Sequence, residues 1–180
     1  MTQEQAAATQ DQEQQAPAFG IEKIYIKDFS LEVPNAPDIF LEHGEPTVDI
    51  QLNNSGTPLG NGIFDATLTV TVTAKLGEKT LFLVEVSQAG IFRMVNVPEQ
   101  EIEPLLAVAC PNILQPYARE AISTATVRAG FAPVLLQPIN FEAIYLSRLQ
   151  ERQAAQAQQI AAPAGEATPA AQAANSTTLH

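Results

Sequence analysis

The chain has 180 residues, a formal net charge of -11, 46% hydrophobic residues and a single cysteine, Cys110. Such a charge argues against nucleic acid and anionic membrane surfaces as partners, because both are bound through lysine and arginine. No stretch reaches the length of a membrane span, no signal peptide is apparent, and one cysteine cannot form an internal disulfide. We therefore expect one domain with tails in the reducing cytoplasm, whose acidity serves either solubility or attraction to a basic partner.

The first strand is expected near Phe19, after a disordered Gln/Ala-rich tail over residues 1–18. Residues 19–33 are rich in β-branched and aromatic side chains. Strict alternation gives two sets, Ile24, Ile26, Asp28, Ser30 and Glu32 on one side and Tyr25, Lys27, Phe29, Leu31 and Val33 on the other. Both sides are partly apolar, which indicates a strand covered once by its own domain and once by another subunit.

A long hairpin is the clearest structural signal. Residues 64–76 alternate apolar and polar without interruption, which predicts a strand with one buried and one wet face. Gly77 to Lys79 supply a turn, and residues 80–87 return antiparallel. Residues 47–52 predict a further strand, whereas the Asn, Ser, Gly and Pro cluster over residues 53–62 predicts a loop.

Helices are predicted after the strands. Residues 102–110 fit a short helix that Pro111 ends, and Asn112 can cap a second helix that stops at Gly130. Three small residues on one face of this second helix would let another helix approach closely: Ala118, Ala121 and Ala125. Residues 131–138 are expected to be extended.

Asn140 is predicted to cap a last helix that begins at Phe141, and residues 153–180 form a second low-complexity tail. The predicted domain therefore spans residues 19–152. Strands followed by helices indicate an α+β fold with helices on one face of an antiparallel sheet.

Catalytic and metal-binding patterns are lacking in the sequence. The two histidines, His43 and His180, have no carboxylate or thiolate partners at metal-binding spacing. No phosphate-binding glycine loop or nucleophile motif can be written, and Cys110 fits a buried small residue. We therefore predict a binding protein without cofactor or metal, not an enzyme.

One face of the hairpin's second strand carries a candidate docking surface. Phe82 and Val84 point to one side, and Leu83 and Glu85 point to the other. If Asp28 and Glu32 of the first strand share that outer side, three acids surround an exposed leucine. Such a group is either an ordinary solvated face or a docking site in which the charges steer and the leucine anchors.

Several long motifs resemble the SecB family of bacterial protein-export chaperones, in the same order and over residues 19–149. They are C-P-N-I-L-Q-P-Y-A-R-E (110–120), Y-I-K-D-F-S-L-E-V-P-N-A-P (25–37), T-V-T-A-K-L-G-E-K-T (71–80), F-L-V-E-V (82–86), A-G-I-F (89–92) and P-I-N-F (138–141). The resemblance implies a four-stranded antiparallel sheet with two main helices packed on one face, assembled as a tetramer that is a dimer of dimers. It also implies a holdase that keeps secretory preproteins unfolded and passes them to SecA, the Sec translocase motor.

The resemblance also implies which residues bind these partners. The positions that match the SecA-docking patch are Asp28, Glu32, Leu83 and Glu85, and the zinc belongs to SecA's basic C-terminal peptide, not to this chain. The candidates for the apolar client groove are Phe40, Phe64, Phe82 and Phe141, each of which could instead be core. Two positions depart from the family pattern, since Gly44 stands where many relatives carry tryptophan and Gln115 replaces a common phenylalanine.

Two other functions stay open at this point. A SecB-like chaperone can be dedicated to a toxin-antitoxin pair or to another cytosolic client. A plain oligomeric scaffold would bind no client at all.

Overall fold

The computed structural model describes residues 16–161, which divide into two units between Tyr145 and Leu146. The first contains a four-stranded antiparallel sheet in the order β1-β4-β3-β2. Its strands are β1 (Ala18–Glu32), β2 (Thr47–Gly60), β3 (Ile63–Leu76) and β4 (Lys79–Val95). The predicted α+β order of strands followed by helices is therefore confirmed. The predicted tails fall largely outside the described residues, at 1–15 and 162–180.

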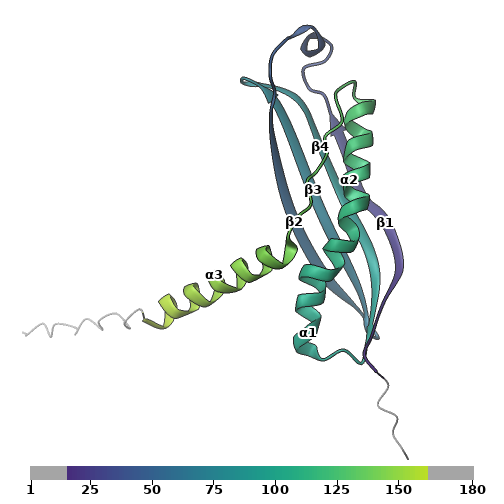
Figure 1. Ribbon diagram of the computed structural model, residues 1–180, viewed down its shortest axis with the longest axis vertical. Coiled ribbons are helices and arrows are strands. Elements are labelled where there is room, and N and C mark those ends of the chain that lie inside the picture. The colour runs from purple at the N-terminus through teal and green to yellow at the C-terminus, as the bar shows by residue number, and fades with distance from the viewer. Residues whose placement is uncertain (1–15, 162–180) are drawn as a thin grey trace, which may run out of the picture. The chain divides into compact units, whose positions relative to one another are not determined.

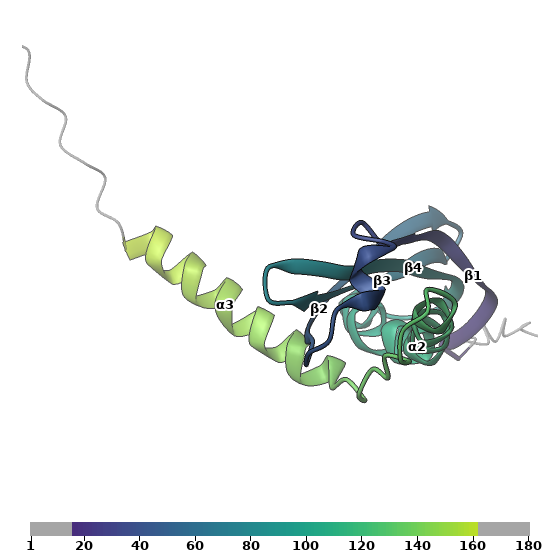
Figure 2. The ribbon, with the colours of Figure 1, turned by 90° about the horizontal axis from the view of Figure 1, so that it is seen from above.

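The helices follow β4 in the chain. They are α1 (Glu99–Pro104), the π-helical turn η2 (Leu105–Ala109), α2 (Cys110–Arg128) and α3 (Phe141–Ala161), and a short 3-10 helix, η1 (Asp38–Leu41), lies between β1 and β2. Helix α2 packs along β3 and β4 (Figure 1). Viewed from above, the sheet curls over α2 (Figure 2). Within residues 16–161 no helix has both the length and the apolarity to cross a membrane.

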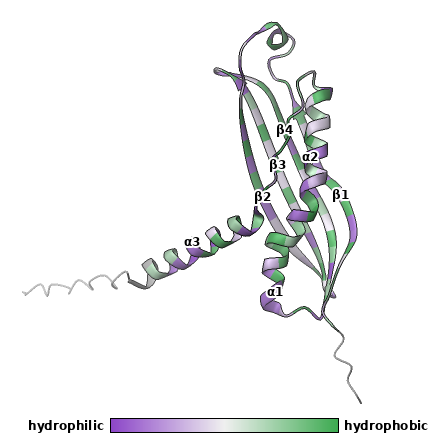
Figure 3. Ribbon diagram, viewed as in Figure 1, coloured by the Kyte–Doolittle hydropathy of each residue, from purple (hydrophilic) through white to green (hydrophobic). Residues whose placement is uncertain are grey.

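The core lies between α2 and the inner face of the hairpin. Leu68, Val70 and Val72 of β3, with Val84 and Val86 of β4, are fully buried. Bands of hydrophobic and hydrophilic residues alternate along the strands, as Figure 3 shows. The two-residue period therefore produces one face that packs under α2 and a second, polar face on the outside of the sheet. This confirms the faces predicted for the hairpin.

Strand β1 departs from the strict alternation predicted for it. Its register on β4 shifts between Ile21 and Lys23 and again between Ile26 and Asp28. Each shift is a β-bulge, in which one extra residue turns the side chains that follow it to the opposite face. The prediction that Asp28 shares a side with Ile24 and Ile26 is therefore wrong.

Strand β2 is longer than predicted. The loop expected over residues 53–62 is wrong, because β2 pairs with β3 as far as Gly60 and only Asn61 and Gly62 form the turn. Both turn residues have positive φ, 52° and 71°. β2 is an edge strand with one hydrogen-bonded neighbour. Pro58, which has no N–H to donate, can lie in it because the open side of an edge strand makes no interstrand hydrogen bonds.

Pro111 does not break the helix as predicted, and Asn112 is not a cap. The chain continues from α1 through η2 into α2 without leaving a helical conformation. Directly before Pro111 the helix widens by one π-helical turn, in which the Cys110 N–H donates to the Leu105 carbonyl, five residues earlier. The widening accommodates a residue that has no N–H to donate and whose ring would clash with a regular preceding turn.

The small residues of α2 face their own sheet. Ala118, Ala121 and Ala125 are buried in the core cluster. Their predicted role as a stripe for another helix is therefore wrong, because the short side chains instead let α2 lie close to β3 and β4. The end of α2 was predicted correctly, since Gly130 follows its C-cap with φ 89°.

The cap of α3 is also confirmed. The Ala143 N–H donates to the Asn140 side-chain oxygen over 2.9 Å. In the second unit α3 continues from Leu146 to Ala161, nine residues past the predicted end of the domain at 152.

Gln115 is a polar residue in an apolar setting. Its side-chain nitrogen is buried and finds no hydrogen-bond partner among the residues that the structure describes. An unmet buried donor destabilises the fold, so Gln115→Met, which keeps the length and removes the amide, should raise the free energy of unfolding by about 1 kcal/mol. Urea denaturation measures this. A loss of stability in Gln115→Met would show that the amide has a partner in the assembled protein.

Candidate functional site

The outer face of the sheet brings the predicted acidic residues together. Strand register gives the cross-strand rows Asp28–Ser87–Thr69, Ser30–Glu85–Thr71 and Glu32–Leu83–Thr73, which run from β1 across β4 to β3. Residues in one row share a face. The even positions of β3 and β4 face the core, so these rows all lie on the opposite, outer side.

We call Asp28, Glu32, Leu83 and Glu85 the acidic patch. Asp28 and Glu32 are exposed, and Leu83 and Glu85 are half-buried. Glu85 accepts a hydrogen bond of 2.6 Å from the Thr71 hydroxyl, which fixes its carboxylate on the outer face. The four residues predicted from the sequence therefore lie on one face of the sheet, with Leu83 beside Glu32 in one row, Glu85 in the next row and Asp28 in the third.

Two apolar hollows lie on the inner side of the sheet, both along β2. The loop hollow, of about 410 Å³, is lined by Pro46, Val48, Ile50, Ala74, Leu81, Phe82 and residues 131–135. The helix hollow, of about 490 Å³, is lined by Asn54, Ser55, Gly56, Pro58, Phe64, Glu99, Ile102, Glu103, Leu106 and Ala107. Ile50 and Leu52 pair with the inward residues Val72 and Val70, so β2 carries both hollows on the core side.

An aromatic chain borders the loop hollow. The ring of Phe131 lies 5.0 Å from that of Phe82 and 5.3 Å from that of Phe40, centroid to centroid. Such contacts are favourable for tilted aromatic pairs. Phe131 was not among the predicted groove residues, although an aromatic side chain directly after the glycine that ends α2 is a signal visible in the sequence.

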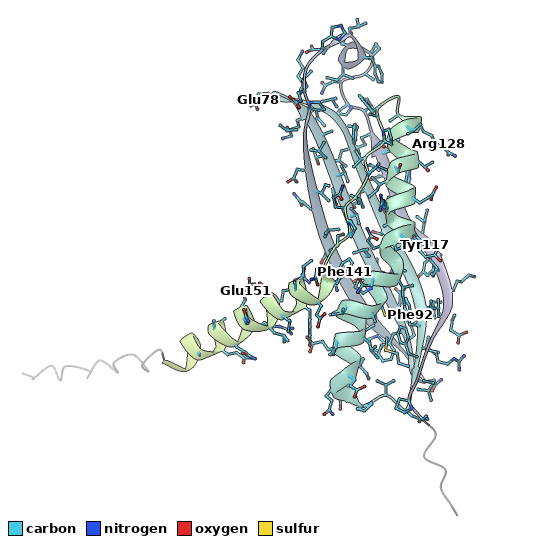
Figure 4. The ribbon with its side chains drawn as sticks, in the orientation of Figure 1. Glu78, Phe92, Tyr117, Arg128, Phe141 and Glu151 are labelled. Atoms are coloured by element: carbon cyan, nitrogen blue, oxygen red, sulfur yellow. The ribbon has the colours of Figure 1, made fainter. Side chains whose placement is uncertain are left out.

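The predicted client-groove residues have different environments. Phe40 is 48% exposed, and Phe64 is half-buried at the helix hollow. Phe82 is 3% exposed and lines the loop hollow from the core side. Phe141, at the start of α3 (Figure 4), is 4% exposed, packs in the core cluster and lines neither hollow. The loop hollow is also lined by exposed apolar residues that were not among the predicted groove residues, namely Val48, Ile50 and Leu135.

Gly44 lies where a side chain would not fit without a shift. A Cβ at this position would stand 2.6 Å from a methyl carbon of Leu76. A larger residue here therefore requires the end of the Leu76 side chain to move.

A second apolar surface follows β1 and α2. On β1 the inward residues Ile21, Ile26 and Phe29 are exposed, because α2 does not cover this edge of the sheet. Tyr117 (Figure 4) and, further along the helix, Val127 are exposed on α2 itself. Several exposed large apolar side chains on adjoining elements are typical of a protein interface.

No cluster of three or more metal-ligating side chains occurs within the described part of the chain. His43 is exposed in the loop before β2. The arrangement offers surfaces for binding, and its chemistry is that of charge and apolar contact.

Cys110 is buried at the start of α2, and burial raises the pKa of its thiol to about 12. At pH 8 only about one thiol in ten thousand is then ionised, and the thiolate is the reactive form. We expect iodoacetamide to alkylate the folded protein far more slowly than the urea-unfolded chain, with a rate that rises as the pH rises. Mass spectrometry of the labelled protein measures both rates. Equal rates in the two states would contradict the burial.

Comparisons with known proteins agree with this fold. Residues 12–152 match the model of the family described as SecB, preprotein translocase subunit SecB. The protein-export protein SecB of Dechloromonas aromatica is 63% identical over 147 residues, covering 82% of this chain and 97% of that protein. The protein of the same name from Chromobacterium violaceum is 60% identical over 148 residues, with 82% and 99% covered.

A solved structure shares the fold at much lower identity. It is the SecB-like chaperone Rv1957 of Mycobacterium tuberculosis in complex with a ChAD peptide from the HigA1 antitoxin. The TM-score is 0.57 at 17% identity, with 67% of this chain and 90% of that chain covered. The family match and the close relatives cover most of the sequence, so the chain belongs to the SecB family of protein-export chaperones.

Proposed function

We propose that this protein is a cytoplasmic holdase that keeps secretory preproteins unfolded and delivers them to SecA. The observation that carries the proposal is the separation of two surfaces of different chemistry. The acidic patch occupies the outer face of the sheet, and the apolar hollows open on the inner side along β2. A client and a motor can then be bound at the same time.

The acidic patch is the proposed SecA-docking surface. Its three carboxylates suit the basic, zinc-bearing C-terminal peptide of SecA, since complementary charges speed encounter. Leu83, directly across from Glu32 at one end of the acidic patch, supplies apolar contact beside the charges. Support comes from the shared outer face of Asp28, Glu32 and Glu85, which requires the second bulge in β1.

The hollows are the proposed client site. An unfolded chain exposes apolar side chains, and about three or four of them, each worth about 1.5–3 kcal/mol on burial, give roughly 5–10 kcal/mol of gross contact energy. Ordering the extended segment costs several kcal/mol of this, so tight capture needs several sites at once. Phe40 and Phe64 are proposed to contact clients directly, and Phe82 and Phe141 to support the hollows from the core.

We propose a tetramer, a dimer of dimers, as the source of that multivalency. The exposed apolar residues of β1 and α2 provide the surface that such an assembly would cover. An oligomer of four chains multiplies the hollows, so one precursor can be held at several points.

The test is a refolding assay. The protein should slow the folding of a denatured secretory precursor, and SecA with ATP and translocation-competent vesicles should release the precursor. This chain contains no tryptophan, so the precursor's own tryptophan fluorescence reports its folding without background. A precursor that refolds at the same rate with and without the protein contradicts the holdase, and is what a plain scaffold would give.

The second candidate is a chaperone dedicated to a toxin-antitoxin pair. Its support is the complex of Rv1957 with an antitoxin peptide, although that protein is only 17% identical to this chain. The relatives at about 60% identity carry the export name, which favours export. A pull-down decides: SecA is expected to be retained, and an antitoxin retained without SecA would reverse the assignment.

A further inference from the structure

The second bulge in β1 decides which face carries the acids. Ile26 pairs with Gln88 and Asp28 pairs with Ser87, so Lys27 is the extra residue. Without this insertion the alternation from Ile26 would turn Asp28 and Glu32 toward α2 and Lys27, Phe29 and Leu31 outward. The acidic patch therefore exists only while the bulge is formed.

A polar cluster on the outer face spans this bulge. The Tyr25 hydroxyl donates to one carboxylate oxygen of Asp65 over 3.0 Å, and the Lys27 ammonium donates to the other over 2.7 Å. Asp65 belongs to β3, and β4 separates it from β1. One carboxylate thus ties the inserted residue, Lys27, and Tyr25, two residues before it, to a strand that is not their neighbour.

The surroundings of the cluster hold it in place. The Asp65 side chain is only 12% exposed. Ala89 lies between Tyr25 and Thr67 in a cross-strand row. It is fully buried although it does not belong to the core cluster, so it is covered on the outer face of the sheet. On the inner side the Gln88 amide donates to the Tyr25 carbonyl over 2.8 Å. The Asp65 carboxylate also raises the pKa of Lys27 through the hydrogen bond and its charge.

We propose that Tyr25, Lys27 and Asp65 are positioning residues for SecA docking, because they hold the bulge that brings Asp28 and Glu32 to the face of Leu83 and Glu85. The inference rests on the proposed docking function. All three residues lie outside the acidic patch. One of them, Lys27, carries a positive charge, which by itself would repel a basic partner.

Lys27→Met tests this, because the loss of its charge and the loss of its contact with Asp65 should change the affinity for SecA in opposite directions. Removing a cation beside the acidic patch should strengthen the binding of a basic partner if only charge matters. Loss of the bulge clamp should instead weaken SecA binding, by about threefold to tenfold given the modest strength of exposed ion pairs. Tyr25→Phe, which changes no charge, should weaken binding in the same direction. Titration calorimetry with purified SecA measures both.

Hydrogen–deuterium exchange of the full protein supplies the second readout. Both variants should speed exchange over residues 26–32 and leave the hairpin unchanged. Glu22→Gln is the matched control, since Glu22 is the extra residue at the first bulge and pairs with Arg93 over 2.5 Å. It should leave SecA affinity within about twofold of wild type.

The outcomes separate the two proposals. Tighter or unchanged SecA binding by Lys27→Met overturns the positioning role, as does weaker binding without faster exchange. Faster exchange with unchanged affinity overturns it as well. If the wild-type protein does not bind SecA, the docking proposal is wrong, and so is the positioning role. The exchange data then still show whether Tyr25, Lys27 and Asp65 hold the bulge.

Discussion

Neutralising the acidic patch should reduce SecA binding by about 100-fold while client capture stays intact. The variant is Asp28→Asn with Glu32→Gln and Glu85→Gln, which removes three charges and keeps side-chain shape. Rim charges steer association and paired charges slow dissociation, so their joint loss affects both rate constants. After Glu85→Gln the side-chain carbonyl oxygen can still accept the hydrogen bond from the Thr71 hydroxyl, so we expect the fold and the assembly to persist. Surface plasmon resonance with immobilised SecA measures the rates.

The matched control removes three carboxylates elsewhere. Glu45, Glu78 and Glu142 are exposed and lie outside the acidic patch, with Glu78 at the tip of the β3–β4 hairpin (Figure 4). Their triple change to glutamine should alter SecA affinity by less than about threefold, through net charge alone. Raising the salt concentration should weaken the wild-type complex more than that of the patch variant. An equal loss in both triple variants would assign the effect to overall charge.

Making the loop hollow polar should cut client capture at least about tenfold and leave SecA binding unchanged. Ile50→Ser and Leu135→Ser replace two lining residues that are 43% and 56% exposed. Because both side chains are about half exposed, their truncation should lower the stability of the protein without client only slightly. A bound client, in contrast, loses about 1 kcal/mol or more of apolar contact at each position. Repetition over several sites multiplies the loss. The delay of precursor refolding, followed by precursor fluorescence, measures it.

Leu41→Ser is the control for surface apolarity. Leu41 is 78% exposed in η1, beside Phe40, and lines neither hollow. It should hold precursors as well as the wild type does. If Leu41→Ser and the double variant lose capture equally, clients bind to exposed apolar surface in general and not to the loop hollow.

The alternating residues of β3 and β4 determined the faces of the hairpin without any help from the rest of the chain. A period of two leaves a strand no choice of which side chains are buried, so Leu83 and Glu85 were correctly placed outside and Phe82 inside. The helix ends at Asn140 and Gly130 were also predicted correctly, since both residues act within a few positions of themselves, whereas the cap predicted at Asn112 was wrong.

Only the tertiary structure decided the rest. The inserted residue of the β1 bulge, Lys27, contacts Asp65, which lies 38 residues along the chain, and no local pattern encodes such a contact. Residues 53–60 form a strand because their hydrogen bonds to β3 outweigh the turn-forming preference of their side chains. The hollows likewise form where β2 meets residues 131–135 and α1, segments that are distant in sequence. Short-range periodicity fixes which side of a strand is apolar, but long-range contacts fix its register, and the register places the acids of β1 beside Leu83.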